Sequence, residues 1–407
     1  MNRLAALLLL LAVPAAAQPA LPGWTAPAAS SAPVMAWRGL ELVYSYPVET
    51  DLKEPDLREA SFVWPEMISQ ARKSVDVEQF YVAPSTGQPL EATLTALRRA
   101  GERGVKIRVL LEKKFEKNSL DGIAILKTIP NLELRIIDWS QVAGAGIVHA
   151  KFMVVDGAAA FVGSQNWDWR SLKHIHELGL RVAEPEVVKD VAAVFEHDWA
   201  AAAAPEGARV PPTGAIDRSR RAYLVASPKG FTPAGIGDSE AELAALVGEA
   251  KTELSIQVMD YNPTTYSRPK RHYAAIDNAL RDASVRGLKV RLAVADWSTG
   301  EPGLSHLRSL SLLPGVSVKV CTVPESSEGF VPFSRVLHSK YMTVDGTVLW
   351  LGTSNWAGGY LDESRNLELV VRDPALAGRA KLIFERVWAS PYCAPLELTK
   401  DYPKPKR

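Results

Sequence analysis

Hydrophobic and polar residues form one pattern that occurs twice along the chain. Residues 74–81 (SVDVEQFY) and 254–261 (LSIQVMDY) each read as a strand that ends in tyrosine. In the segment after each, apolar residues recur every three to four positions up to a glycine, Gly104 or Gly287, which predicts an amphipathic helix. Further strands are predicted at 105–111, 132–137, 288–294 and 316–320. This order predicts two similar α/β units, each a mixed sheet flanked by helices.

The stretches between these units set the predicted domain boundaries. Residues 205–219 are rich in proline and glycine and predict a linker between domains at 38–204 and 220–395, with a tail at 396–407. At the start, Arg3 precedes the apolar run 4–13 and an Ala-x-Ala end. This pattern predicts a signal peptide over 1–17, cut near Ala17, and a linker over 18–37. We therefore expect an exported protein, periplasmic or secreted, without a stable membrane anchor.

The amino-acid composition excludes few classes of function. The 407 residues include 47 Lys+Arg and 46 Asp+Glu, which gives a formal charge of +1 and argues against a basic DNA-packaging protein. The sequence has two cysteines, Cys321 and Cys393. Export permits a disulfide between them, but two separate buried thiols are equally compatible with the sequence.

The candidate chemistry lies in a motif that occurs once in each half. His149, Lys151 and Asp156 are followed by Gly163, Ser164 and Asn166, and the second half repeats this spacing with His338, Lys340, Asp345, Gly352, Thr353 and Asn355. Residues i and i+2 of a strand share one face, so each histidine points with its lysine. Asp-Gly at 156–157 and 345–346 predicts tight hairpin turns.

A two-fold arrangement of the halves would bring both sets of side chains to one pocket. Two ammonium groups and two amides suit a tetrahedral phosphodiester. One neutral imidazole could attack phosphorus while the other, protonated, supplies a proton to the leaving oxygen.

The repeated motif resembles the phospholipase D superfamily. The stretches 163–179, 258–292, 338–360 and 388–392 resemble the branch of lysosomal 5′-exonucleases and related poxvirus proteins. This resemblance implies two domains packed with pseudo-two-fold symmetry and chemistry through a covalent phosphohistidine, without a cofactor or metal. It implies His149 as nucleophile and His338 as general acid. Lys151, Lys340, Asn166 and Asn355 would hold the phosphate.

The resemblance also implies supporting roles. A carboxylate after each motif, Glu177 and Glu368, would hold the second nitrogen of its histidine. Asp156, Asp345, Ser164 and Thr353 would support the site. We expect Tyr81, Tyr261, Trp167 and Trp356 to contact substrate, with core packing as the alternative. Trp169 and Tyr360, which also follow the motif asparagines, could stack on bases at the mouth of the pocket. His174 and His176 could instead be read as metal ligands.

The implied substrate is single-stranded nucleic acid, cut from the 5′ end. A phospholipase or phosphatidyl transferase acting on membrane lipid is the alternative, because the same residues would serve it. A binding protein without activity is a third hypothesis, disfavoured by the two complete motifs. A homodimer is compatible with the sequence.

Overall fold

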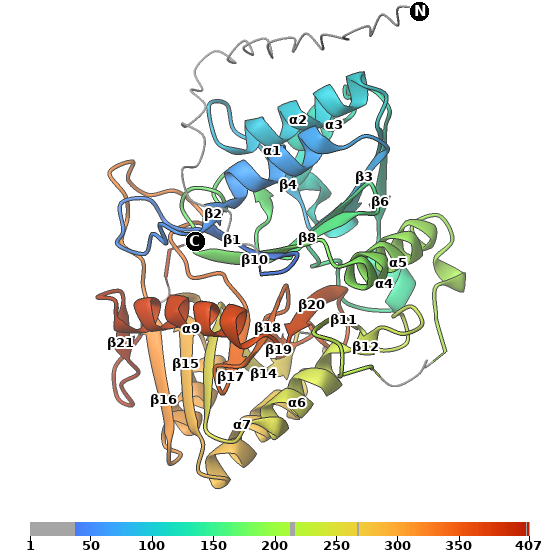
Figure 1. Ribbon diagram of the computed structural model, residues 1–407. Helices are drawn as coiled ribbons and strands as arrows, with labels where there is room; N and C mark the ends of the chain where they lie inside the picture. The colour runs from blue at the N-terminus through green and yellow to red at the C-terminus, as the bar shows by residue number, and fades with distance from the viewer. Residues whose placement is uncertain (1–36, 212–215, 267, 404, 407) are drawn as a thin grey trace, which may run out of the picture.

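The computed structural model describes residues 37–211, 216–266, 268–403, 405 and 406. The predicted signal peptide, and all of the following linker except Trp37, lie outside the described residues. Two mixed β-sheets, one in each half, form the framework of the fold (Figure 1). This confirms the predicted α/β class with two similar units.

The first sheet has eight strands in the order β2-β1-β10-β8-β7-β3-β5-β6. Parallel pairs join β3, β5 and β6, whereas β1, β10, β8 and β7 pair in antiparallel fashion and continue antiparallel onto β3. The strands are β1 (Leu40–Ser45), β2 (Arg58–Glu59), β3 (Ser74–Gln79), β5 (Lys106–Glu112), β6 (Leu132–Ile137), β7 (Phe152–Val155), β8 (Ala159–Gly163) and β10 (Glu177–Val182).

The second sheet repeats this order and adds one strand at its edge. Its order is β12-β11-β20-β18-β17-β13-β15-β16-β21. The strands are β11 (Ala222–Ser227), β12 (Gly237–Asp238), β13 (Glu253–Val258), β15 (Lys289–Ala295), β16 (Val316–Cys321), β17 (Tyr341–Val344), β18 (Val348–Gly352), β20 (Asn366–Val371) and β21 (Cys393–Pro395). Two small parallel pairs complete the halves: β4 (Val82–Ala83) with β9 (Trp167–Asp168), and β14 (Tyr261–Thr265) with β19 (Trp356–Gly358).

Helices cover both faces of each sheet. In Figure 1, α1 (Ala60–Gln70) and α2 (Leu90–Glu102) lie outside the first sheet, and α6 (Ser239–Glu249) and α7 (Ala275–Val285) lie outside the second. Between the sheets lie α5 (Pro185–Ala201) and α9 (Pro374–Ala389). Shorter helices are α3 (Leu120–Leu126), α4 (Trp139–Ala143), α8 (Gly303–Ser311), η1 (Lys113–Ser119), η2 (Pro205–Gly207) and η3 (Asp296–Thr299).

The two halves share a central hydrophobic core. Buried side chains from both sheets meet those of α5 and α9 in one cluster, which includes Phe152, Phe195, Leu351 and Phe384. Each half has in addition its own core beneath its outer helices. Burial of apolar surface is the main favourable contribution to packing, so the shared core fixes how the halves sit relative to one another. Within the described ranges, no helix is long and apolar enough to cross a membrane.

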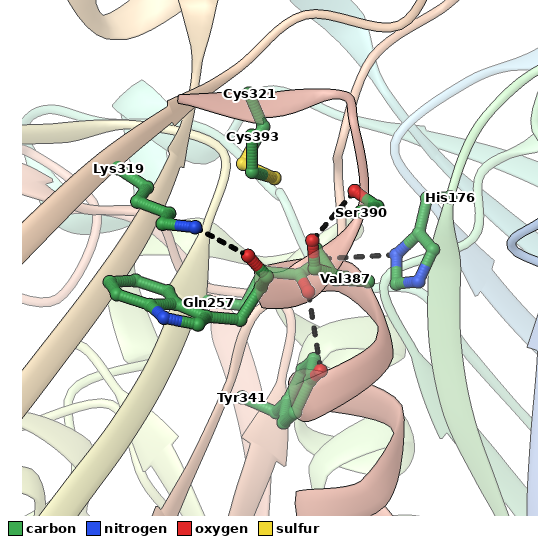
Figure 2. Close-up of a disulfide and its surroundings, with 9 residues drawn as sticks. His176, Gln257, Lys319, Cys321, Tyr341, Val387, Ser390 and Cys393 are labelled. Carbon is green, nitrogen blue, oxygen red and sulfur yellow. Dashed lines mark hydrogen bonds between the residues drawn. A yellow bond between two sulfur atoms is a disulfide. The ribbon is translucent and has the colours of Figure 1, made fainter. Parts of the chain in front are cut away.

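The two cysteines form a disulfide, which answers the question that the sequence left open. Cys321 on β16 pairs directly with Cys393 on β21, with Cα atoms 4.0 Å apart. Figure 2 shows this disulfide near the end of α9, where Lys319 donates a hydrogen bond to the α9 backbone. The chain beyond β21 stays close to this half, because the Leu396 N–H donates to the Val318 carbonyl.

Candidate active site

Each His-x-Lys segment lies immediately before a hairpin, β7–β8 or β17–β18. The Asp-Gly turns of these hairpins have positive φ at both residues, 55° and 62° at Asp156 and Gly157, and 51° and 66° at Asp345 and Gly346. This is the turn geometry that the sequence predicts. Both aspartates accept hydrogen bonds from three successive backbone N–H groups, at residues 72–74 and 251–253. They therefore anchor the hairpins and lie outside the chemistry.

Backbone pairing across the pseudo-two-fold axis brings the two histidines together. The His149 N–H donates to the Arg365 carbonyl at 2.9 Å, and the His338 N–H donates to the His176 carbonyl at 2.9 Å. Each motif is thus held by the residue just before β10 or β20 of the opposite half. Both imidazoles line one cavity of about 720 Å³ at the interface between the halves, together with Asn166.

Glu177 holds the histidine of the opposite half rather than its own. Its Oε2 lies 2.8 Å from His338 Nδ1, and its Oε1 accepts a hydrogen bond from Ser171. Burial raises the pKa of Glu177 to about 7, and nearby Lys340 partly offsets this effect. Burial and the two lysines lower the pKa of His338, but the carboxylate in contact with the ring favours the imidazolium.

A neutral amide, not a carboxylate, holds His149. Its Nδ1 lies 3.0 Å from Asn366 Oδ1, and Asn366 Nδ2 donates to the Tyr360 carbonyl, which turns the oxygen toward the ring. Nδ1 must then carry the proton, so Nε2 keeps its lone pair. Burial and the two lysines lower the pKa of His149. His149 is therefore built to stay neutral.

The expectation for Glu368 is wrong, because its carboxylate contacts no histidine. Glu368 accepts hydrogen bonds from Ser354 and Ser239. Asn366, and not Glu368, follows His338 by the 28 residues that separate Glu177 from His149. Glu368 instead supports the turn that carries Asn355, and burial raises its pKa to about 7.

The lysines and asparagines lie at or beside the two histidines. Lys151 donates to the His149 carbonyl, and burial followed by Lys340 lowers its pKa strongly. Burial lowers the pKa of Lys340 to about 7. In the described part of the chain, the buried Lys340 ammonium and the buried Asn355 amide have no hydrogen-bond partner. Polar groups buried in this way call for a ligand.

The two hydroxyl residues have a shared structural role. Ser164 accepts a hydrogen bond from the Leu178 N–H, and Thr353 accepts one from the Leu367 N–H. Each hydroxyl thereby ties its turn to the strand that begins with a histidine partner. Thr353 also donates to Asn366 Oδ1 at 2.9 Å, which fixes that amide.

Only one of the four predicted substrate-binding aromatic residues lines the cavity. That residue is Tyr81, whose hydroxyl donates to Asp168. Trp167, Trp356 and Tyr261 are 1% exposed and belong to the outer cores, so the expectation that they contact substrate is wrong.

The error at Tyr261 is a shift of one residue in the comparison of the halves. Val82 pairs with Trp167 and Tyr261 pairs with Trp356, so Tyr261 corresponds to Val82. The counterpart of Tyr81 is therefore Asp260, which also lines the cavity. In a strand a one-residue shift moves a side chain to the opposite face.

Sequence reasoning found Tyr81 and Tyr360 and missed the other aromatic residues of the cavity. Phe80 and Tyr360 meet the His149 ring edge to face, with centroids 5.1 and 4.9 Å away. Further aromatic residues lining the cavity are Phe115, Tyr266, Trp297 and Phe333. Several lie in loops without periodicity, so no pattern marked them, although Phe80 directly precedes the predicted Tyr81.

His174 and His176 have other partners than a metal. His176 Nδ1 contacts Ser339 and Gln257, and His174 lies 3.3 Å from Glu328. Among the residues that the structure describes, no group of three or more His, Cys, Asp or Glu side chains is arranged to hold a metal ion.

Comparisons with known proteins agree with this geometry. The chain matches the family described as cardiolipin synthase, PLD-like domain, over residues 65–199 and 243–388. It is 32% identical to phospholipase D Z of Dictyostelium discoideum over 82% of this chain and 85% of that protein. It is 31% identical to the 5′-3′ exonuclease PLD3 of Rattus norvegicus over 84% of this chain and 77% of that protein. A phosphatidylserine synthase structure from Haemophilus influenzae shares the fold, with a TM-score of 0.58 at 14% identity, over 83% of this chain and 85% of that one.

The fold and site define a two-domain α/β protein with one composite site at the domain interface. The chain belongs to the phospholipase D-like family. It is a phosphodiesterase of that superfamily.

Proposed function

We propose that this phosphodiesterase hydrolyses single-stranded nucleic acid through a covalent phosphohistidine on His149. The observation that carries the proposal is the different treatment of the two histidines in one cavity: His149 is held by an amide and His338 by a carboxylate. A neutral ring with a free nitrogen can attack phosphorus, and a ring stabilised as imidazolium can give up a proton.

In the first step, His149 Nε2 attacks phosphorus and the bond to the leaving oxygen breaks. The His338 imidazolium transfers its proton to that oxygen, and the leaving alcohol departs. In the second step, water attacks phosphorus and the P–N bond breaks. His338 takes the proton of that water, which releases a phosphate monoester and restores the neutral His149 ring and the His338 imidazolium.

The remaining motif residues would stabilise the phosphorane-like transition state. Asn166 lines the cavity with both histidines, and the charges of Lys151 and Lys340 act on both rings. Lys340 and Asn355 have buried polar groups without a hydrogen-bond partner in the described residues, which suits oxygen atoms of a bound phosphate. Binding of an anion would also raise the pKa of Lys340, because it favours the ammonium form.

The lining of the cavity favours nucleic acid over phospholipid. Aromatic side chains from both halves surround the histidines, and base–aromatic stacking is worth about 1–3 kcal/mol per base. The similarity to a protein named 5′-3′ exonuclease supports this choice, whereas the similarity to one named phospholipase D supports the alternative.

We also propose that the protein is exported after removal of residues 1–17. The Cys321–Cys393 disulfide supports this proposal, because disulfides persist in oxidising compartments outside the cytosol.

A single comparative assay tests the function. Purified protein lacking residues 1–17 is incubated, with and without millimolar EDTA, with a single-stranded oligonucleotide, its duplex and phosphatidylcholine vesicles. We expect release of mononucleotides from the single strand in both buffers, and none with His149→Ala. Cleavage of the vesicle lipid alone would overturn the nucleic-acid assignment in favour of the lipid alternative.

A further inference from the structure

Two cationic side chains besides the histidines line the cavity in the described residues, Lys114 and Arg170, and Arg170 is the one that an ion pair with a buried carboxylate holds in place. The Arg170 side chain lines the cavity and forms an ion pair with the buried Asp168 at 2.8 Å. Its Nη1 donates to the Pro332 carbonyl of the opposite half, and Tyr81 donates to the other side of the ion pair through Asp168. With the Nε–H, which donates to Asp168, two of the five guanidinium N–H groups are hydrogen-bonded, and together with the Nη2 ion pair they hold the plane of the side chain in place.

The corresponding position in the second half carries no side chain. The segments from His149 to Glu177 and from His338 to Asn366 have equal length, so Arg170 corresponds to Gly359. Gly359 has a φ of +97°, and a Cβ there would lie 3.3 Å from the Tyr266 ring and 3.5 Å from a Glu363 oxygen. One wall of the cavity therefore presents a guanidinium, and the other presents Tyr266 and Glu363.

Hydrogen bonds connect the Arg170 segment to the His338 side of the cavity, because Arg170 donates to the Pro332 carbonyl in the segment that leads to His338. Ser171, the neighbour of Arg170, donates to Glu177, which holds His338. On the other side, Tyr360, the neighbour of Gly359, packs against His149 and against Tyr266. The wall with the cation thus belongs to the general acid, and the aromatic wall belongs to the nucleophile.

In an in-line displacement the two walls contact different parts of the substrate. The nucleophile and the leaving oxygen lie on opposite sides of phosphorus, so a leaving oxygen protonated by His338 extends along the wall of Arg170. In a nucleic-acid strand, the leaving nucleoside carries the next phosphate. Arginine suits phosphate because its planar fork donates parallel hydrogen bonds.

We propose that Arg170 binds the phosphate that follows the scissile one on the leaving nucleoside, and so selects substrates with a second phosphate at that position. The inference rests on the proposed function and deepens it. The aromatic wall beside His149 then receives the retained 5′ nucleoside.

Three thymidine dinucleotides test this selection. TpT has only the scissile phosphate, TpTp adds a phosphate to the leaving nucleoside, and pTpT adds one to the retained nucleoside. We expect the wild-type kcat/KM for TpTp to exceed that for TpT by about ten- to a hundredfold, as one charge-assisted hydrogen-bonding site gives. We expect no such gain for pTpT.

The variant Arg170→Gln should bring the TpTp to TpT ratio close to one, while its rate on TpT stays within a few-fold of wild type. Arg170→Lys should keep part of the ratio. The control Arg98→Gln changes a cation that bonds Thr128 on the outside of the first half and should keep the whole ratio.

Each other outcome overturns the inference. An equal loss on TpT and TpTp would mean that Arg170 only positions the Ser171–Glu177 pair. A wild-type preference for pTpT, or no preference, would exclude the assigned subsite while leaving the nuclease function intact. Cleavage of bis(p-nitrophenyl) phosphate without cleavage of any dinucleotide would instead remove the proposed nucleic-acid function, and this subsite with it.

Discussion

The two halves share a framework and differ in how each treats its histidine. Both sheets have the same strand order up to the edge, and both motifs sit before the same Asp-Gly hairpin. At the position 28 residues after the histidine, however, the first half has Glu177 and the second has Asn366. Because each of these residues reaches the histidine of the opposite half, the carboxylate serves His338 and the amide serves His149.

This comparison shows how a duplicated domain acquires two roles from one motif. Identical imidazole and lysine spacing would give two equivalent groups. A single exchange of carboxylate for amide separates them, because a carboxylate favours the charged ring and an amide oxygen favours the neutral one. The pairing across the axis also makes each half depend on the other for its chemistry.

Replacing the histidines should give the largest effects and the clearest break in the symmetry. His149→Ala should lower hydrolysis by about 10⁵-fold or more and abolish the phosphoryl-enzyme. His338→Ala should slow hydrolysis by about 10²–10⁴-fold and still form the adduct from a p-nitrophenyl ester, whose leaving group needs no proton. Acid quenching and intact mass measurement detect the adduct. An adduct that forms only in His149→Ala would reverse the two roles.

Removing the carboxylate should impair only the general acid. Glu177→Gln should lower turnover of a nucleic-acid diester by about 10²–10³-fold, less than the roughly 10⁴-fold loss on replacing the corresponding serine-protease aspartate by asparagine. Burial and the two lysines lower the pKa of His338, and the negative charge of Glu177 opposes that effect. Without the carboxylate the imidazolium is lost at lower pH, so the basic limb of the pH–rate profile should move down. Turnover of a p-nitrophenyl ester, whose leaving group needs no proton, should fall far less. Equal losses of turnover on the nucleic-acid diester and the p-nitrophenyl ester, with an unchanged basic limb, would contradict a role of Glu177 in general acid catalysis.

Adding a carboxylate at the other histidine is the reciprocal test. Asn366→Asp should raise the pKa of His149, so the ring becomes protonated and unreactive at a higher pH. The acidic limb should move up by about one unit, with about tenfold lower activity at pH 5 and little loss above the limb. The control Asn366→Leu removes the acceptor altogether and should lower activity at every pH. A limb that stays in place in Asn366→Asp would show that residue 366 does not tune His149.

The sequence was sufficient for the fold class, the repeat and the motif residues, because these depend on periodicity and spacing. It was insufficient for the partners of the histidines. Nothing in a linear repeat says that a strand of one half faces the motif of the other, and the nearest carboxylate, Glu368, lies two residues beyond the correct position. Counting the same 28 residues in both halves would have found Asn366.

The predictions for the aromatic residues Trp167 and Trp356 were wrong for a related reason. Trp167 and Trp356 follow the motif asparagines directly, but each pairs with a neighbouring strand and turns into an outer core. The side chains that surround the histidines come instead from loops and short 3-10 helices, such as those carrying Phe333 and Phe115. Loops obey no period, so hydrophobic patterning does not reveal which of their residues meet.

Glu368 should affect stability more than chemistry. Burial raises its pKa to about 7, above the value of an unfolded glutamate, so the folded state binds the proton more tightly. The contribution of Glu368 to the free energy of unfolding is therefore present at pH 5 and is lost as pH rises through 7. Glu368→Gln cannot ionise, so relative to wild type it should gain about 1–3 kcal/mol between pH 5 and pH 8 in urea unfolding. Turnover should fall less than tenfold. If Glu368→Gln lowered turnover as much as Glu177→Gln and also shifted a limb of the pH–rate profile, Glu368 would act on a histidine after all.

The disulfide marks a difference between the halves that should leave activity nearly untouched. Only the second sheet has the edge strand β21, and Cys393 on it is bound to Cys321 across a sequence separation of 72 residues. Neither cysteine lines the cavity.

Cys321→Ser with Cys393→Ser should lower the free energy of unfolding by about 2–4 kcal/mol, because the unfolded chain regains the entropy that the closed loop removed. At temperatures well below the transition, kcat/KM on TpT should stay within about twofold of wild type. Denaturation in urea and steady-state kinetics on the same preparation measure the two quantities, and wild-type protein treated with a reductant provides the matched control. A large fall in kcat/KM of the folded double variant would show that the edge of the second sheet is coupled to the composite site, and that the two halves differ in more than their histidine partners.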